Sequence, residues 1–188
     1  MTDVRPKPKV ATVWLDGCSG CHMSLLDLDE RLITLAGLVD VVYSPVVDDK
    51  QFPQQVDLTL IEGAVSSDED YRKAVMIRAR SACVLALGDC AVTGNVPTMR
   101  NYFDRSALFE RAYVENAAHP ADASQRRLSL PVLGVPSLRP KALPVHEVIK
   151  VDVFLPGCPP PADAIWFVLL EILAGRKPTP TDVSRFGR

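Results

Sequence analysis

The stretch Val10-Ala-Thr-Val-Trp-Leu-Asp-Gly-Cys-Ser-Gly-Cys21 carries the main signals for both the fold and the chemistry of this chain. Its first six residues, 10–15, form a short apolar run rich in β-branched side chains, which is typical of a buried strand. Asp16 and Gly17 then give a turn signal, and two cysteines follow in a CxxC spacing. The stretch therefore predicts a strand that ends in a loop carrying two thiols.

Two more cysteines stand in similar surroundings. Cys90 follows Gly88-Asp89, and Cys158 lies in Leu155-Pro-Gly-Cys-Pro-Pro-Pro161, so both lie in turn-forming segments. The fifth cysteine, Cys83, belongs to an apolar run and has the character of a small buried hydrophobic residue. Four thiolates from three distant loops suit a 4Fe–4S cluster, which takes one ligand for each iron.

Strand and helix signals alternate along most of the chain. Apolar runs predict further strands, and helical spacing of leucines and other apolar residues predicts helices between them; the strands are expected at 39–43, 56–61, 82–87 and 151–155, and the helices at 25–35, 66–80 and 162–174. Ser66-Ser-Asp-Glu69 has the pattern of a capping box for the second of these helices. Such strands, separated by helices, indicate an α/β fold with a parallel sheet covered on both faces.

The segment before the last strand is less regular. Residues 101–115 have room for one helix, and residues 120–144 are rich in proline and carry no clear period. We therefore expect a long irregular insertion between the fourth strand and the last one.

The loops that leave the carboxyl ends of parallel strands lie at one edge of the sheet, where ligands bind. Cys18 and Cys21 follow the first predicted strand, Cys90 follows the fourth, and Cys158 follows the last. We therefore expect the four thiols to meet at one site. Three residues next to them are candidates for supporting the metal centre from its surroundings: Glu62, Gly17 and Gly157.

Structural zinc is the main alternative, because four-cysteine zinc sites also begin with CxxC. Zinc sites are usually built from two close-set pairs, whereas Cys90 and Cys158 each stand alone. The spacing favours iron–sulfur and leaves open a zinc-stabilised binding module. His22, directly after Cys21, is interpreted as a residue near a helix N-terminus that hydrogen-bonds nearby backbone.

Composition narrows the class of protein. With 188 residues, 47% hydrophobic and 23% charged, the chain is expected to form one domain over 1–188, with a flexible N-terminal tail of about nine residues. A net charge of −2 argues against nucleic acid as a partner. No apolar run reaches the roughly 18 residues of a membrane helix, and the first residues lack the apolar core of a secretion signal. A cytoplasmic location is therefore expected.

Four motifs together resemble the small subunit of nickel–iron hydrogenases, in particular the cytoplasmic NAD-reducing, bidirectional type. The resemblance runs from about residue 10 to about residue 175, and its motifs are 13–24, Glu62-Gly63, Gly88-Asp-Cys90 and 155–161. It implies a flavodoxin-like, doubly wound domain that holds the proximal 4Fe–4S cluster; the implied ligands are Cys18, Cys21, Cys90 and Cys158.

The resemblance also implies a division of labour. Hydrogen is split at the nickel–iron centre of a separate large subunit, and the small subunit relays the electrons towards iron–sulfur and flavin (diaphorase) subunits that reduce NAD. The chain is thus expected to belong to a hydrogen:NAD+ oxidoreductase without being catalytic alone. No cysteine follows Cys158, so we expect one cluster in this chain.

Related families remain as alternatives. Quinone oxidoreductase subunits of respiratory complexes carry a tandem Cys-Cys, so Cys18-Ser-Gly-Cys21 favours the hydrogenase branch. F420-linked and sulfur-linked small subunits share the short form of this chain. No FMN is expected, because the loop after the first strand, which holds the FMN phosphate in flavodoxin-like folds, carries the two cysteines.

Overall fold

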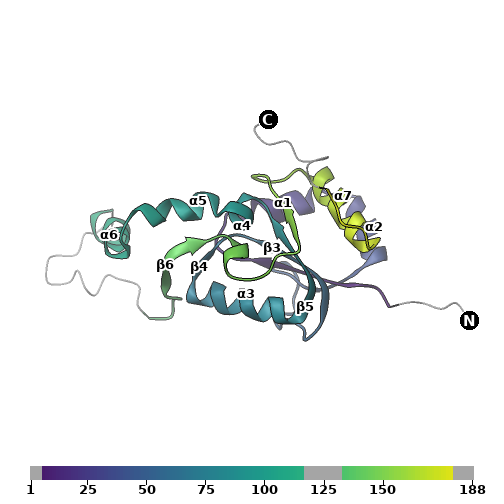
Figure 1. The fold of residues 1–188 in the computed structure, drawn as a ribbon, viewed down its shortest axis with the longest axis horizontal. Coiled ribbons are helices and arrows are strands. Elements are labelled where there is room, and N and C mark those ends of the chain that lie inside the picture. The colour runs from purple at the N-terminus through teal and green to yellow at the C-terminus, as the bar shows by residue number, and fades with distance from the viewer. Residues whose placement is uncertain (1–5, 117–132, 180–188) are drawn as a thin grey trace, which may run out of the picture.

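The computed structural model describes residues 6–116 and 133–179, and its centre is a five-stranded sheet in which every neighbouring pair is parallel. The strand order is β2-β1-β3-β5-β7 (Figure 1). The strands are β1 (Lys9–Trp14), β2 (Asp40–Tyr43), β3 (Val56–Glu62), β5 (Ser81–Leu87) and β7 (Val153–Leu155). This order, with the first strand inside the sheet, is the flavodoxin-like topology that the resemblance to hydrogenase small subunits implies.

Helices cover both faces of the sheet. Figure 1 shows α1, α2 and α7 grouped on one side and α3 on the other. The helices are α1 (Gly20–Leu26), α2 (Arg31–Leu38), α3 (Asp68–Arg80), α4 (Asp89–Thr93), α5 (Asn95–Thr98), α6 (Arg105–Glu110) and α7 (Ala162–Leu173). The structure also contains three short helical turns in its described part. Two are 3₁₀ turns, η1 (Met99–Tyr102) and η4 (Val145–Glu147), and one is a π turn, η2 (Arg111–Glu115).

Alternate residues of the strands serve two separate cores. In β5, Leu85 and Leu87 pack with α7, whereas Val84 and Ala86 pack with α3 on the opposite face. All four side chains are fully or almost fully buried. A strand that is buried on both faces needs apolar residues at every position, which is why these strands show continuous apolar runs rather than alternating ones.

The first predicted helix is in fact two helices. The leucine spacing over 25–35 suggests a single helix, but α1 ends at Leu26 and α2 begins at Arg31. Between them Asp29 has a positive φ of 56°, which no continuing α-helix accommodates, while Leu28 is buried in the bend. The single-helix prediction was therefore wrong. The chain bends so that Leu28 is buried, and neither glycine nor proline lies at this bend to signal it in the sequence.

The capping box of α3 is real but lies one residue later than predicted. Ser67 is the N-cap, and its hydroxyl accepts the backbone N–H of Asp70 at 3.1 Å. The Asp70 carboxylate accepts the Ser67 backbone N–H at 2.9 Å in return. Two adjacent serines each fit the sequence pattern, and the pairing with Asp70 decides between them.

The predicted irregular insertion contains a strand. Residues 117–132 lie outside the described part of the chain, but β6 (Leu138–Leu143) pairs antiparallel with the short strand β4 (Val65–Ser67). Pro140 inside β6 hides this strand in the sequence pattern, because proline is confined to sheet edges. The prediction of one helix over 101–115 is replaced by η1, α6 and η2.

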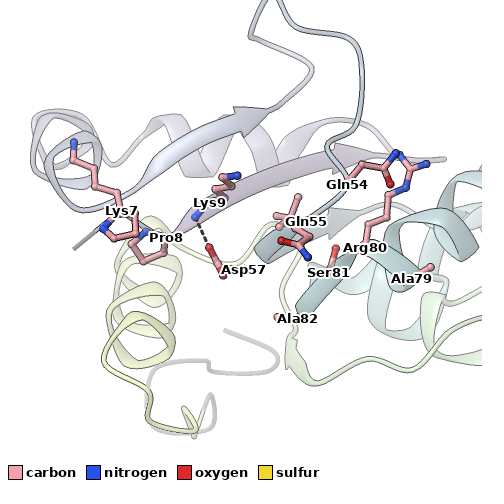
Figure 2. A pocket seen from close by; sticks show the side chains of 12 residues that line it. Lys7, Pro8, Lys9, Gln54, Gln55, Asp57, Ala79, Arg80, Ser81 and Ala82 are labelled. Carbon is pink, nitrogen blue, oxygen red and sulfur yellow. Dashed lines mark hydrogen bonds between the residues drawn. The ribbon is translucent and has the colours of Figure 1, made fainter. Parts of the chain in front are cut away.

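The amino-terminal edge of the sheet carries a cleft of about 750 Å³, away from the cysteine loops (Figure 2). The backbone N–H of Lys9 donates to Asp57 there at 2.7 Å, so β1 begins within the predicted tail. Gln54, Gln55 and Arg80 line the same cleft. Within residues 6–116 and 133–179, no helix is long and apolar enough to cross a bilayer.

Candidate metal centre

The register of the sheet brings the loops that carry the cysteines to the same edge of the sheet. Trp14, Glu62, Leu87 and Leu155 are the last residues of β1, β3, β5 and β7, and they pair in a single row across these strands. The chain leaves each strand just beyond this row. The loops after β1, β5 and β7 hold the four predicted cysteines, so the site lies at the carboxyl edge of the sheet, where parallel sheets bind ligands.

The four predicted thiols share one electrostatic neighbourhood. Burial, then Glu62, then Cys90, Cys18 and Cys158 raise the pKa of the Cys21 thiol far above its ordinary value. Burial first, followed by Cys158 and Cys18, raises the pKa of Cys90 to about 11. Thiolates that repel one another in this way call for positive charge between them, and metal ligation supplies it by binding the deprotonated form.

The thiols differ in exposure in a way that suits a group held at the protein surface. Cys21 is buried, Cys90 is partly buried, and Cys18 and Cys158 are exposed; all are free of disulfides. Cys83 stands apart in β5, where Asp152 and Arg78 are the charged groups that act on it. The structure thus groups the four predicted cysteines and separates the fifth.

In the described part of the chain, no three His, Cys, Asp or Glu side chains lie close enough together to hold one metal ion. A 4Fe–4S cluster takes one thiolate on each of four irons. The donor set, four cysteines from three loops, fits the predicted cluster.

Backbone hydrogen bonds fasten the β5 and β7 loops to each other. The N–H of Gly88 donates to Leu155 O at 2.8 Å, and the N–H of Asp89 donates to Gly157 O at 2.9 Å. The Asp89 side chain accepts the Gly157 N–H at 2.7 Å. Gly157, predicted to support the site, is joined through its backbone to the loop of Cys90, and Asp89 is a partner that the sequence did not reveal.

Glycine lets the backbone approach the thiols closely. A Cβ on Gly88 would lie 2.2 Å from Cys21 Sγ, and Gly88 has a φ of 82°, in the region that favours glycine. At Gly17, also predicted to support the site, a Cβ would lie 3.3 Å from Gly63 Cα. The backbone at Gly88 therefore packs directly on the Cys21 thiol, which the sequence motif alone does not reveal.

The Glu62 side chain accepts hydrogen bonds from the first turn of α1, the helix that contains the second cysteine of the CxxC motif. Its carboxylate is buried and accepts the backbone N–H of Cys21 at 3.3 Å and that of His22 at 2.9 Å. The His22 ring contacts the same carboxylate through Nδ1 and lies 3.0 Å from Thr12 Oγ1 through Nε2. Thr12 in turn donates to Ser44 at 2.8 Å.

These contacts correct the interpretation of His22. The ring does not bond nearby backbone; it joins two side chains from β1 and β3, at positions 10 and 40 residues away along the chain. No local pattern signals such a contact. His22 orients the buried carboxylate that fixes the amide groups of the CxxC helix.

A known protein family matches the part of the chain that contains this site. Residues 18–172, from the first cysteine to the last helix, match the family described as NADH ubiquinone oxidoreductase, 20 Kd subunit. The chain belongs to this family. The match begins at Cys18 and includes all four grouped cysteines.

Subunits of hydrogenases are similar to the chain in sequence. It is 39% identical to the delta subunit of the NAD-reducing hydrogenase HoxS of Cupriavidus necator, over 96% of this chain and 86% of that one. It is 35% identical to one of the subunits of the F420-non-reducing hydrogenase of Methanothermobacter marburgensis, but spans 55% of its length.

A solved structure is also similar to the whole chain. A chain in the crystal structure of an NAD+-reducing [NiFe]-hydrogenase in the H2-reduced state superposes with a TM-score of 0.87 at 36% identity, covering 96% of this chain and 99% of that one. The resemblance to hydrogenase small subunits that the motifs carry is thereby confirmed, as is the flavodoxin-like fold.

Replacing Glu62 by glutamine tests the support under the CxxC helix. The variant removes a negative charge and one of two acceptors, so we expect a cluster that is retained but easier to reduce, by on the order of 1–2 kcal/mol per electron. Loss of an acceptor for a buried N–H should also lower the unfolding free energy by about 1–3 kcal/mol. Redox titration followed by electron paramagnetic resonance and thermal unfolding measure the two effects.

The exposed Glu147 provides the matched control, because Glu147→Gln removes the same charge from a surface turn. It should change neither quantity. A Glu62→Gln protein with the wild-type potential and melting temperature would show that the carboxylate has no influence on the site.

Proposed function

We propose that this chain holds one 4Fe–4S cluster on Cys18, Cys21, Cys90 and Cys158 and acts as the electron-transfer small subunit of an NAD-reducing nickel–iron hydrogenase. One observation supports the proposal: the three loops that carry the four thiols leave the carboxyl edge of a fold that superposes, with a TM-score of 0.87, on a chain of an NAD+-reducing [NiFe]-hydrogenase. The chain belongs to an enzyme, and its own part in the reaction is to carry electrons.

The chain's residues divide the work of holding the cluster. The four thiolates bind the irons and, when the cluster is present, the cluster supplies one-electron redox chemistry. Glu62 and Gly88 set the position of Cys21, and the Asp89–Gly157 bonds set the loop of Cys158. A scaffold fixed in this way changes little on reduction, which favours rapid electron transfer.

The surroundings of the cysteines support a partner at this edge. Several large apolar side chains are exposed on the elements next to the thiols: Trp14, Met23, Val96 and Met99. Exposed apolar surface, where it is contiguous, marks protein–protein interfaces. We propose that the nickel–iron large subunit covers it, and that iron–sulfur and flavin subunits of the diaphorase receive the electrons and reduce NAD.

Two further features belong to the proposal. No FMN is bound by this chain, because the loop that would hold the flavin phosphate is the CxxC loop, whose amides at Cys21 and His22 are already bound to Glu62. The protein acts in the cytoplasm, where cysteines stay out of disulfides, as all five do here, and where NAD is reduced.

Anaerobic purification of the complex through a tag on this chain tests the proposal. We expect a large subunit and diaphorase subunits to co-purify, hydrogen-dependent reduction of NAD+, and four iron and four acid-labile sulfide atoms per copy of this chain, as a 4Fe–4S cluster requires. The chain expressed alone should take up no hydrogen.

Each alternative predicts a different result. A colourless preparation with zinc and without sulfide would identify a zinc-stabilised binding module. Hydrogen-dependent reduction of F420, sulfur or a quinone, with no reduction of NAD+, would move the chain to another hydrogenase or oxidoreductase branch. Flavin bound in equal amount to the isolated chain would overturn the absence of FMN.

A further inference from the structure

The junction between α4 and α5 faces two of the four thiols. The side-chain amide of Asn95 donates to Cys158 Sγ at 3.5 Å. The backbone N–H of the next residue, Val96, faces Cys90 and lowers the pKa of its thiol. One short segment therefore directs two N–H groups at sulfurs that come from two different loops.

The backbone at this junction is held in an uncommon conformation. Gly94 and Asn95 have φ angles of 87° and 34°, so two consecutive residues lie in the left-handed region. Such a conformation costs a non-glycine residue about 1–2 kcal/mol, although asparagine tolerates it better than most. Thr98 holds it in place, because its hydroxyl donates to Asn95 O at 2.7 Å and its N–H donates to Gly94 O at 3.3 Å.

The strained junction has a clear geometric result. It ends α4, which carries Cys90, and begins α5 at Asn95, whose side-chain amide reaches Cys158. An asparagine amide is a neutral donor, so it contacts the sulfur without adding charge to the site. Strain of this kind persists where the surrounding structure over-determines it, and it is concentrated at functional sites.

Building on the proposed cluster, we propose that Asn95 is a positioning residue that raises the reduction potential of the cluster through its N–H···S hydrogen bond to Cys158. Hydrogen bonds to ligand sulfurs stabilise the reduced cluster, which carries one more negative charge than the oxidised one. Asn95 supplies no ligand, so its removal leaves the four thiolates in place and changes the energy of the electron that they carry.

Two substitutions separate this effect from structural damage. Asn95→Gly removes the donor and accepts the left-handed backbone without strain, whereas Asn95→Asp keeps the shape and replaces the donor with a negative charge. We expect Asn95→Gly to lower the equilibrium constant for reduction about tenfold, which is about 59 mV for one electron. The shift should have the same direction and be larger in Asn95→Asp.

The measurement is a redox titration of the purified complex followed by electron paramagnetic resonance, with iron and sulfide contents determined for each variant. Gln55→Glu is the control, because it adds the same charge as Asn95→Asp in the exposed cleft at the opposite edge of the sheet (Figure 2). It should leave the potential unchanged.

Two results would overturn the inference. One is a full cluster with the wild-type potential in Asn95→Gly, which would show that the amide exerts no influence. The other is loss of the cluster from both Asn95 variants while Gln55→Glu keeps it, which would make Asn95 a structural support. Absence of iron and sulfide from the wild-type complex is a separate result, and it would reject the proposed function itself.

Discussion

A Cys90→Ala substitution is expected to remove the proposed iron–sulfur cluster from the complex and with it hydrogen-dependent NAD+ reduction. Changes in the groups around metal ligands already cost about 10–100-fold in metal affinity, so loss of a ligand should lower the cluster content more than tenfold. Cys90 is suited to the test because it comes from a loop of its own and has no neighbouring cysteine to replace it. Iron, acid-labile sulfide and visible absorbance per copy of the chain measure the loss.

Cys83→Ala is the matched control. Cys83 is half-buried in β5, contacts the core beneath α7, and has Asp152 and Arg78 rather than the other thiols around it. Its substitution creates a small cavity, so we expect about 1 kcal/mol of lost stability and a full cluster. Equal cluster contents in the Cys90→Ala and wild-type complexes would contradict the ligand assignment, as would cluster loss in Cys83→Ala.

The grouping of the four cysteines was predictable because the signals for the strands and for the loops after them are local in the sequence. A strand buried on both faces shows itself as an apolar run, and the loop at its end shows itself by glycine, proline and cysteine. Parallel strands then force these loops to one edge, and the paired ends at Trp14, Glu62, Leu87 and Leu155 realise that geometry. Strand ends were therefore predictable to within one or two residues.

The features that could not be predicted depend on contacts between distant residues. His22 meets Glu62 from 40 positions away, and the Asp89–Gly157 bonds span 68 positions. The strand β6 contains a proline, and its partner β4 is only three residues long. Neither strand therefore shows the alternating or continuous apolar pattern by which a strand is recognised in a sequence. The break between α1 and α2 is set by burial of Leu28, which is a property of the packed core.

Gly88→Ala is expected to be a strongly damaging single-methyl change at this edge. The added Cβ would lie 2.2 Å from Cys21 Sγ, and the φ of 82° is unfavourable for alanine. Backbone strain and overpacking each cost about 1–3 kcal/mol, so the free energy of unfolding should fall by about 2–5 kcal/mol, a large part of a typical domain's stability. Because the clash falls on a ligand sulfur, cluster content should fall as well, measured by iron and sulfide analysis alongside thermal unfolding.

Gly37→Ala is the control that distinguishes damage at the cysteine site from the general effect of replacing a glycine. Gly37 lies in α2, is exposed, and has no atom within 4 Å of an added Cβ, so alanine there should raise stability by about 0.5–1 kcal/mol through its better helix propensity. The same chemical change is thus expected to have opposite effects at two glycines of one chain. If Gly88→Ala kept a full cluster and the wild-type melting temperature, the backbone at residue 88 would not pack on Cys21. The thiol would then have to lie elsewhere, and the four-cysteine site would lose the close approach between β5 and the CxxC helix on which its geometry depends.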